Sequence, residues 1–294
     1  MARVAEPERI VLLTPTQAAR SAYWPQAARC FAHQTYQPRG ALQWLIVLDG
    51  CASGDAAIDA RAERACRAIV ERELEPDDRE RVHVRSAPHA STGTIGAKRN
   101  AANRLALALG AAYICSMDDD DYYAPRYVSV MMSLLREGAC HTPPRLIAGG
   151  SASYIYFSHN RTVYASRPFG PSHSCHGALC YARAYLDTHS YDETRTSGEE
   201  PGFLEKFSVP MMQWPRVCSP SDVLTVALTH SANTVDRTAH LENNVRAGGM
   251  FPCSFSVLDV VVSTLHSAGQ EQEDRSKRTI AFYAEHAPAG PVKK

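Results

Sequence analysis

Residues 111–125 read AAYICSMDDDDYYAP, an apolar run that ends in four consecutive aspartates. The part from Ala112 to Met117 has the length and composition of a buried strand. In open α/β sheets ligands bind at the carboxyl ends of the strands, so the aspartates lie where a site is expected. Because side chains alternate along extended backbone, Asp118 and Asp120 are expected to face one ligand together, while Asp119 points elsewhere.

The acidic run favours a divalent cation. Two carboxylates held a few ångströms apart repel each other unless a cation lies between them. Hard oxygen ligands favour Mg²⁺ or Mn²⁺, and phosphate oxygens of a substrate complete the coordination shell. An EF-hand is excluded, since its acids spread over about 12 residues around a central glycine. The alternative is a solvated acidic loop that caps the helix after Pro125.

Strand and helix patterns alternate through the first half of the chain. Apolar runs predict strands at 10–13, 44–48, 82–84 and 112–117. Apolar residues at helical spacing predict helices at 18–33 (interrupted near Pro25), 56–74, 96–109 and 127–135. This alternation predicts an α/β fold with a single Rossmann-like, mainly parallel sheet and helices on both faces.

The second half is less regular. Its patterns predict paired strands at 146–157 and 161–165, a short helix at 199–207, a strand at 223–229, and helices at 257–266 and 274–285. No internal repeat or long linker separates these segments. The simplest interpretation is one α/β domain with a C-terminal helical elaboration.

Composition and charge exclude several classes. The 294 residues include 31 Lys and Arg and 31 Asp and Glu, and a formal net charge of zero argues against a nucleic-acid partner. The nine cysteines are odd in number, widely spaced and without a Cys-x-x-Cys pair, which favours reduced thiols and a cytoplasmic location. The chain shows no signal peptide and no transmembrane segment. The spacing within 172–180, SHSCHGALC, does not match a structural zinc site.

Four segments taken together resemble the inverting family-2 glycosyltransferases of the GT-A fold. In the family's order they are IVLLTPT at 10–16, WLIVLDG at 44–50, GAKRNAA at 96–102 and MDDDDYYAP at 117–125. The resemblance covers roughly residues 8–235. It implies a glycosyltransferase that uses Mn²⁺ or Mg²⁺ to move a sugar from a nucleoside diphosphate donor, most often a UDP-sugar, to an acceptor hydroxyl with inversion.

The resemblance also implies a domain division. Residues 1–240 would form the glycosyltransferase domain, with a nucleotide-binding half at about 8–125 and an acceptor half at about 126–240. Residues 241–294 would form a C-terminal helical extension and tail. The acceptor, whether a glycan, a lipid-linked molecule or a protein, is not indicated, and neither are the donor sugar and the oligomeric state.

Matched residue by residue, the resemblance implies roles for side chains of the first half. Asp49 would accept a hydrogen bond from the base, Arg99 would contact the base or the diphosphate, and Asp118 would touch the ribose. Asp120 would hold the metal. The nucleotide-sugar site would further include Thr14, Pro15, Thr16 and Asp119.

Sugar transfer to a hydroxyl also needs a general base within hydrogen-bond reach. The segment SGEEPGFL at 197–204 resembles the acidic pair of the family, with Glu200 as the base and Glu199 in the donor site. His230, after a predicted strand, resembles a further metal ligand, which would shift the preference toward Mn²⁺. The segment before the base would add His176 and Gly177. The alternative for the acidic pair is that both acids lie in the first turn of a helix, where the helix dipole favours negative charge.

Other classes of protein were compared with the same residues. A sugar nucleotidyltransferase would carry a glycine-rich basic loop after the first strand, where 14–18 reads TPTQA. A P-loop enzyme is excluded because residues 93–99, GTIGAKR, lack the spacing and the Ser or Thr after lysine. The remaining alternative is a non-catalytic protein with a GT-A fold that binds nucleotide sugars or carbohydrate.

Overall fold

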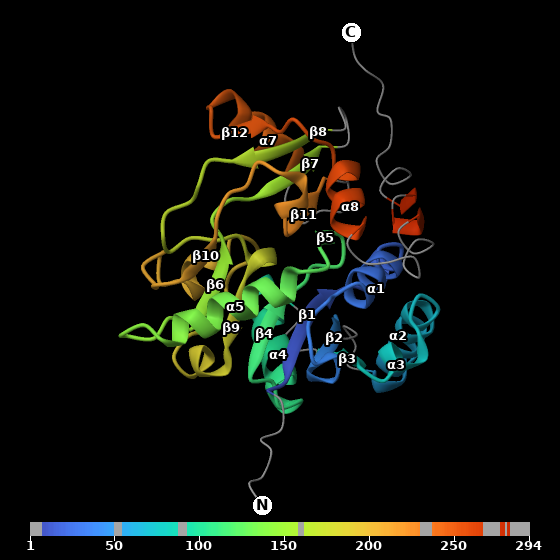
Figure 1. The fold of residues 1–294 in the computed structure, drawn as a ribbon. Helices are drawn as coiled ribbons and strands as arrows, with labels where there is room; N and C mark the ends of the chain where they lie inside the picture. Colours follow the sequence, from blue (N-terminus) through green and yellow to red (C-terminus); the bar gives the residue numbers. More distant parts are fainter. Residues whose placement is uncertain are drawn as a thin grey trace, which may run out of the picture.

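The computed structural model describes residues 8–49, 55–87, 93–157, 162–229, 237–266, 277–279 and 281–282. Its main sheet has seven strands in the order β10-β6-β9-β4-β1-β2-β3 (Figure 1). These are β1 (Ile10–Thr16), β2 (Leu42–Leu48), β3 (Val82–Ser86), β4 (Tyr113–Ser116), β6 (Ile147–Gly150), β9 (Cys180–Ala182) and β10 (Met212–Trp214). Strands β4, β1, β2 and β3 are parallel, and β9 runs antiparallel to both β4 and β6. The predicted mainly parallel sheet is therefore confirmed.

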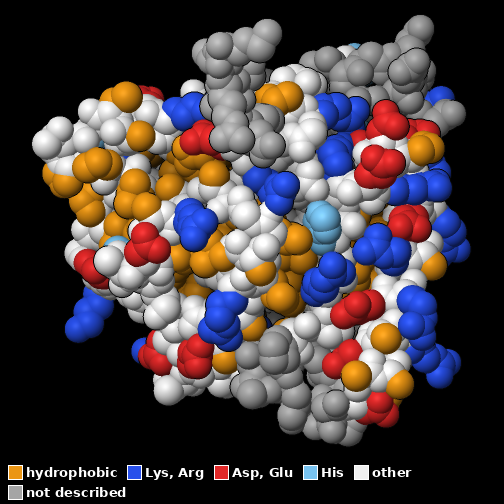
Figure 2. Space-filling model, turned by 90° about the horizontal axis from the view of Figure 1, so that it is seen from below, with side chains coloured by type: hydrophobic (Ala, Val, Ile, Leu, Met, Phe, Trp, Pro, Cys, Tyr) orange, Lys and Arg blue, Asp and Glu red, His pale blue; other side chains and the backbone are white. Residues whose placement is uncertain are grey.

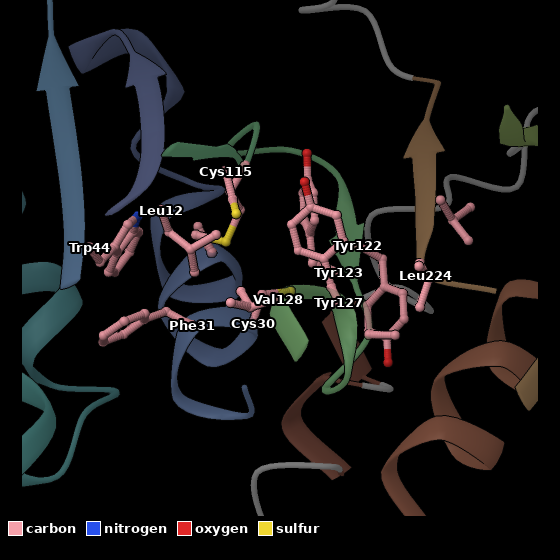
Figure 3. Packing of buried hydrophobic residues seen from close by; sticks show 14 of the residues in the cluster. Leu12, Cys30, Phe31, Trp44, Cys115, Tyr122, Tyr123, Tyr127, Val128 and Leu224 are labelled. Atoms are coloured by element: carbon pink, nitrogen blue, oxygen red, sulfur yellow. The ribbon is translucent and has the colours of Figure 1, made fainter. Parts of the chain in front are cut away.

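Alternate residues of β1 and β2 enter two separate hydrophobic cores, which is why helices cover both faces. Leu12 and Trp44 belong to one core, where the Trp44 ring stacks on Phe31 with ring centroids 5.3 Å apart (Figure 3). Val11 and Leu45 belong to the other core. A strand buried on both faces reads as a continuous apolar run, as these two strands do.

Most helices lie where the sequence patterns predict them, but residues 76–79 and 237–246 form helices that no pattern indicated, and the helix predicted at 199–207 spans only 200–203. The helix predicted at 274–285 lies largely outside the described residues. The helices are α1 (Trp24–Ala32), α2 (Ala56–Glu71), α3 (Pro76–Arg79), α4 (Ile95–Ala108), α5 (Tyr127–Ala139), α6 (Glu200–Phe203), α7 (Arg237–Arg246) and α8 (Val257–Leu265). The predicted helix at 18–33 is divided into the 3₁₀ turn η1 (Ala18–Arg20) and α1. Pro25 lies in the first turn of α1, where its missing N–H costs no helical hydrogen bond. It therefore marks a helix start.

A second sheet of five strands is an addition to the predicted architecture. Its order is β12-β8-β7-β11-β5, with β5 (Tyr122–Tyr123), β7 (Tyr154–Phe157), β8 (Thr162–Ser166), β11 (Thr225–Leu228) and β12 (Met250–Pro252). The predicted pairing of 146–157 with 161–165 is confirmed for β7 and β8, which are antiparallel, but residues 147–150 form β6 and belong to the main sheet instead. Strand β12, which no pattern indicated, pairs with β8, and apolar side chains of α8 enter the core that holds Leu12. Residues beyond 240 thus complete both the second sheet and the core.

Surface and cysteines agree with the composition. On the face drawn in Figure 2, Lys and Arg side chains of the described residues lie interspersed with Asp and Glu side chains. Each described cysteine is a free thiol. Within the described ranges, no helix combines the length and the apolar character needed to cross a membrane.

Gly96 in the first turn of α4 is expected to be intolerant of a side chain. A Cβ there would overlap the backbone carbonyl of Asp192, whereas a Cβ at Gly93 would meet nothing within 4 Å. Overpacking against backbone costs up to about 3 kcal/mol, which exceeds the roughly 1 kcal/mol that alanine gains over glycine in a helix. Gly96→Ala should therefore lower the free energy of unfolding by about 2 kcal/mol. Urea unfolding of both variants tests this, and equal stabilities of Gly96→Ala and Gly93→Ala would contradict it.

Candidate functional site

A cavity of about 520 Å³ lies at the carboxyl ends of β1, β2 and β4 and is also lined by residues of the second sheet. It brings together segments that are far apart in the sequence. Of the predicted site residues, it is lined by Pro15, Thr16, Asp49, Arg99, Asp118, Asp119, Asp120, His176, Gly177, Glu199 and Glu200. Thr14 is not among the lining residues, because its Oγ1 accepts a hydrogen bond from Trp44 Nε1 at 2.9 Å within the core. His230 lies outside the described residues.

The aspartate side chains of the acidic run are grouped differently from the sequence prediction. Residues 119–120 form a turn, so the alternation expected of extended backbone does not apply. Asp119 does not point away from Asp120, because Arg20 binds both. Arg20 Nη2 lies 2.6 Å from Asp119 Oδ1 and 2.6 Å from Asp120 Oδ2. The expectation that Asp119 points elsewhere was therefore wrong, whereas Asp118 and Asp120 both line the cavity as expected.

Asp119 is held by the side chains of Arg20 and Thr16. It accepts hydrogen bonds from Arg20 Nε at 3.0 Å and from the Thr16 hydroxyl. Trp24 Nε1 in turn donates to Thr16 Oγ1 at 2.9 Å. Burial and the adjacent Asp120 carboxylate raise the pKa of Asp119 to about 6, although Arg20 and Thr16 act in the opposite direction.

The carboxylates of Asp118 and Asp121 both lie close to Gly177. A Cβ on Gly177 would lie 3.2 Å from Asp118 Oδ2 and 3.6 Å from Asp121 Oδ2, so glycine keeps this side of the cavity open. Tyr123 Oη accepts from the Asp118 backbone N–H at 2.8 Å and donates to the Gly177 carbonyl at 2.9 Å. Asp121 Oδ1 accepts from the Leu228 N–H at 3.1 Å, which joins the acidic run to the end of β11.

Arg99 on α4 forms an ion pair with Glu199, one of the two adjacent acids Glu199 and Glu200. Its Nε donates to Glu199 Oε1 at 2.6 Å, and its Nη1 lies 3.8 Å from Asp118 Oδ1. Although burial lowers the pKa of Arg99, Asp118 and Glu199 hold it above its ordinary value. Glu199 is thus neutralised by an ion pair, and Arg99 connects it with the acidic run.

Glu200 makes no ion pair with any residue that the structure describes. Its Oε1 accepts from the backbone N–H of His176 at 3.3 Å. Burial and the neighbouring Glu199 raise the pKa of Glu200 above its ordinary value, with Arg99 and the backbone opposing the change. A carboxylate that is half-buried and unpaired, in a cavity, is more basic than one in water.

His176 is held as a neutral ring. Its Nε2 lies 3.1 Å from Ser116 Oγ and its Nδ1 lies 2.9 Å from Tyr191 Oη. Burial and the nearby Arg99 lower its pKa well below the ordinary value. Two hydroxyl groups therefore fix the side chain of His176, and the backbone N–H of His176 donates a hydrogen bond to Glu200.

Asp49, directly after β2, forms an ion pair through one of its two carboxylate oxygens. Lys98 Nζ lies 2.7 Å from its Oδ2, and both side chains are partly exposed. A surface ion pair of this kind contributes little to stability and separates readily. Asp49 therefore keeps the capacity to accept a hydrogen bond from a ligand.

The charge of the cavity bears on the expected metal. Among the residues that the structure describes, its lining holds seven carboxylates and three cationic side chains, Arg20, Lys98 and Arg99. Such an excess would repel a diphosphate unless a cation accompanied it. Within the described ranges, no group of three or more His, Cys, Asp or Glu side chains is arranged to coordinate a metal ion without further ligands. The donor set therefore fits Mg²⁺ or Mn²⁺ held by one or two carboxylates with substrate phosphates, a usual arrangement for these ions.

Arg20 is the site residue that sequence reasoning missed. It lies in η1, four residues after Thr16, and its side chain is 14% exposed. The available signal was a lone cation directly after the first strand, at the edge where the acidic run was expected. The contact with Asp119 spans 99 residues, so no local pattern indicated the pairing.

The architecture and the cavity define a GT-A type α/β fold. Among solved structures, S. aureus TarS 1–349 in complex with UDP-GlcNAc matches 95% of this chain and 82% of its own length, with 13% identity and a TM-score of 0.50. The mannosyltransferase PcManGT from Pyrobaculum calidifontis, in complex with GDP-Man and Mn²⁺, matches 98% of this chain and 77% of its own, with 12% identity and a TM-score of 0.49. No family model and no curated protein matches the sequence.

Proposed function

We propose that this chain is a glycosyltransferase that moves a sugar from a nucleoside diphosphate donor, most readily a UDP-sugar, to an acceptor hydroxyl with inversion. The observation that carries the proposal is one cavity that holds both the acidic run and the carboxyl of Glu200, which forms no ion pair with a described residue. The GT-A type fold and the four-segment resemblance support it. We further propose that the nucleotide-sugar site is made by the predicted residues lining this cavity.

The proposed reaction is a single displacement. Glu200 accepts the proton of the acceptor hydroxyl while that oxygen attacks the anomeric carbon from the face opposite the diphosphate. The bond from the anomeric carbon to the diphosphate oxygen breaks, its electron pair leaves with the nucleoside diphosphate, and the anomeric carbon is inverted. Asp120, with His230 as a further proposed ligand, would hold Mn²⁺ or Mg²⁺. When bound, such an ion supplies positive charge to the departing diphosphate.

The remaining lining residues have positioning roles in this proposal. Asp49 accepts from the uracil ring N–H after separating from Lys98, and Asp118, 22% exposed at its side chain, faces the ribose. Arg99 keeps Glu199 paired, which leaves Glu200 as the available carboxylate. The backbone of the turn η4 (His176–Ala178) spans the distance between Glu200 and the acidic run through its contacts with Glu200 and Tyr123.

A donor panel tests the proposal. The full chain is incubated with Mn²⁺ and UDP-GlcNAc, other UDP-sugars or GDP-Man, with mixed glycan and lipid-linked acceptors, and released nucleoside diphosphate is measured. We expect release from at least one UDP-sugar, and its loss on adding a chelator. Binding of donor without release or transfer would favour the non-catalytic nucleotide-sugar-binding alternative.

The acidic limb of the pH profile should report Glu200. As the base it acts only when ionised, so kcat/KM should fall as the pH falls through its raised pKa, above the ordinary 4.5. Glu199→Gln removes the carboxylate that raises this pKa and leaves Arg99, which lowers it, so the limb should move to lower pH. Glu63, which accepts from the Ser86 N–H, provides the control variant Glu63→Gln. A limb at the same pH in Glu199→Gln and wild type would refute the assignment.

A further inference from the structure

Arg20 places a cationic side chain on the carboxylate that we assign to the metal. Its Nη2 reaches Asp119 and Asp120 at 2.6 Å each, and both carboxylates are almost fully buried. Oxygen atoms that bind a guanidinium this closely are not available to a second cation without movement. A metal at Asp120 therefore has to share the carboxylate with Arg20 or displace it.

Asp119 holds the guanidinium of Arg20 at two points. Its Oδ2 accepts from Arg20 Nε and its Oδ1 from Nη2, in the two-point geometry that guanidinium groups make with carboxylates. Asp119 is in turn oriented by Thr16, and Thr16 by Trp24. The guanidinium is thus anchored at one carboxylate, and its contact with Asp120 is the one that can be given up while the anchor stays.

We infer that Arg20 is the resident counter-cation of Asp120, which it holds in the donor-free protein and yields to a divalent cation when a nucleoside diphosphate supplies further oxygen ligands. This inference rests on the proposed function. It means that the metal and the nucleotide bind together, and that Arg20 restrains metal binding in the absence of the nucleotide. By linkage, each of the two ligands then raises the affinity for the other by the same factor.

Calorimetric titration of Mn²⁺ into the full chain, alone and in the presence of saturating UDP or GDP, measures this coupling without turnover. Removing the charge in Arg20→Gln should tighten Mn²⁺ binding without nucleotide by about tenfold or more, because a nearby positive charge no longer opposes the metal. The gain from nucleotide should shrink correspondingly. Arg20→Lys keeps the charge but lacks the fork that reaches both carboxylates, so its nucleotide-free affinity should rise by a smaller factor.

Arg29→Gln is the matched control. Arg29 is similarly buried, and its Nη1 lies 2.8 Å from Glu73 Oε2. Neither residue lines the cavity, so the loss of Arg29 should leave Mn²⁺ affinity unchanged. Mn²⁺ binding that is weakened by Arg20→Gln, with and without nucleotide alike, would make Arg20 a structural clamp and overturn the inference. If circular dichroism shows that Arg20→Gln does not fold, Arg20→Lys is used instead. A nucleotide-free Mn²⁺ affinity of Arg20→Lys equal to that of wild type would also overturn the inference.

The outcomes separate this inference from the proposed function. Wild-type protein that binds Mn²⁺ and UDP, or Mn²⁺ and GDP, but is indifferent to Arg20→Gln overturns only the role of Arg20. Wild-type protein whose Mn²⁺ affinity is the same with and without either nucleotide overturns the coupling. Absence of nucleotide binding in every titration contradicts the proposed function as well.

Discussion

Replacing Glu200 with glutamine is expected to slow sugar transfer by about 10²–10⁴-fold, the usual contribution of a positioned general base. Glutamine is nearly the same size and retains an oxygen that can accept from the His176 N–H, so the cavity should keep its shape. What is lost is the ability to take the acceptor's proton. Donor binding, which we propose to depend on the acidic run, β1, Asp49 and Arg99, should therefore remain close to that of wild type.

The measurement pairs initial rates of nucleoside diphosphate release in the presence of acceptor with calorimetric donor affinity. Glu73→Gln is the control, since Glu73 is a partly buried carboxylate paired with Arg29 outside the cavity. A Glu200→Gln variant that transfers sugar at the wild-type rate would exclude Glu200 as the base. Loss of donor affinity instead of rate would assign Glu200 to donor binding.

Replacing Asp120 with asparagine is expected to reduce Mn²⁺-dependent turnover by about 10²–10³-fold, as when one group that stabilises developing charge is removed. The substitution keeps the size of the side chain and removes its negative charge. A neutral amide oxygen binds Mg²⁺ or Mn²⁺ more weakly than a carboxylate, and Arg20 would then pair with Asp119 alone. Donor affinity in the presence of Mn²⁺ should fall together with turnover.

Asp78→Asn is the comparison for this variant. Asp78 is as buried as Asp120 and is also bound by arginines, with Arg39 Nη2 at 2.9 Å from its Oδ1, but it lies outside the cavity. Asp78→Asn should lower stability, because it weakens the pairing with Arg39 and Arg81, but it should leave the Mn²⁺ dependence of turnover intact. Full Mn²⁺-dependent activity in Asp120→Asn would show that the metal, if used, is held by other residues.

From the sequence one can read the four parallel strands β1 to β4 of the main sheet, most of the helices around them and the edge at which the acids gather. These features depend on local patterns, since a strand such as β1 must be apolar on both faces and a helix such as α5 must be apolar on one. The placement of Asp118 to Asp121 at the cavity follows from the rule that ligands bind at the carboxyl ends of parallel strands.

Only the tertiary structure decided which of these side chains bind one another. The turn at Asp119 and Asp120 cancels the alternation of extended backbone, and Arg20, 99 residues before Asp119, then joins both carboxylates. The second sheet likewise depends on pairing distant segments, such as β12 with β8. Contacts between residues far apart in the chain are selected by packing and charge in three dimensions, and local sequence periodicity carries no record of them.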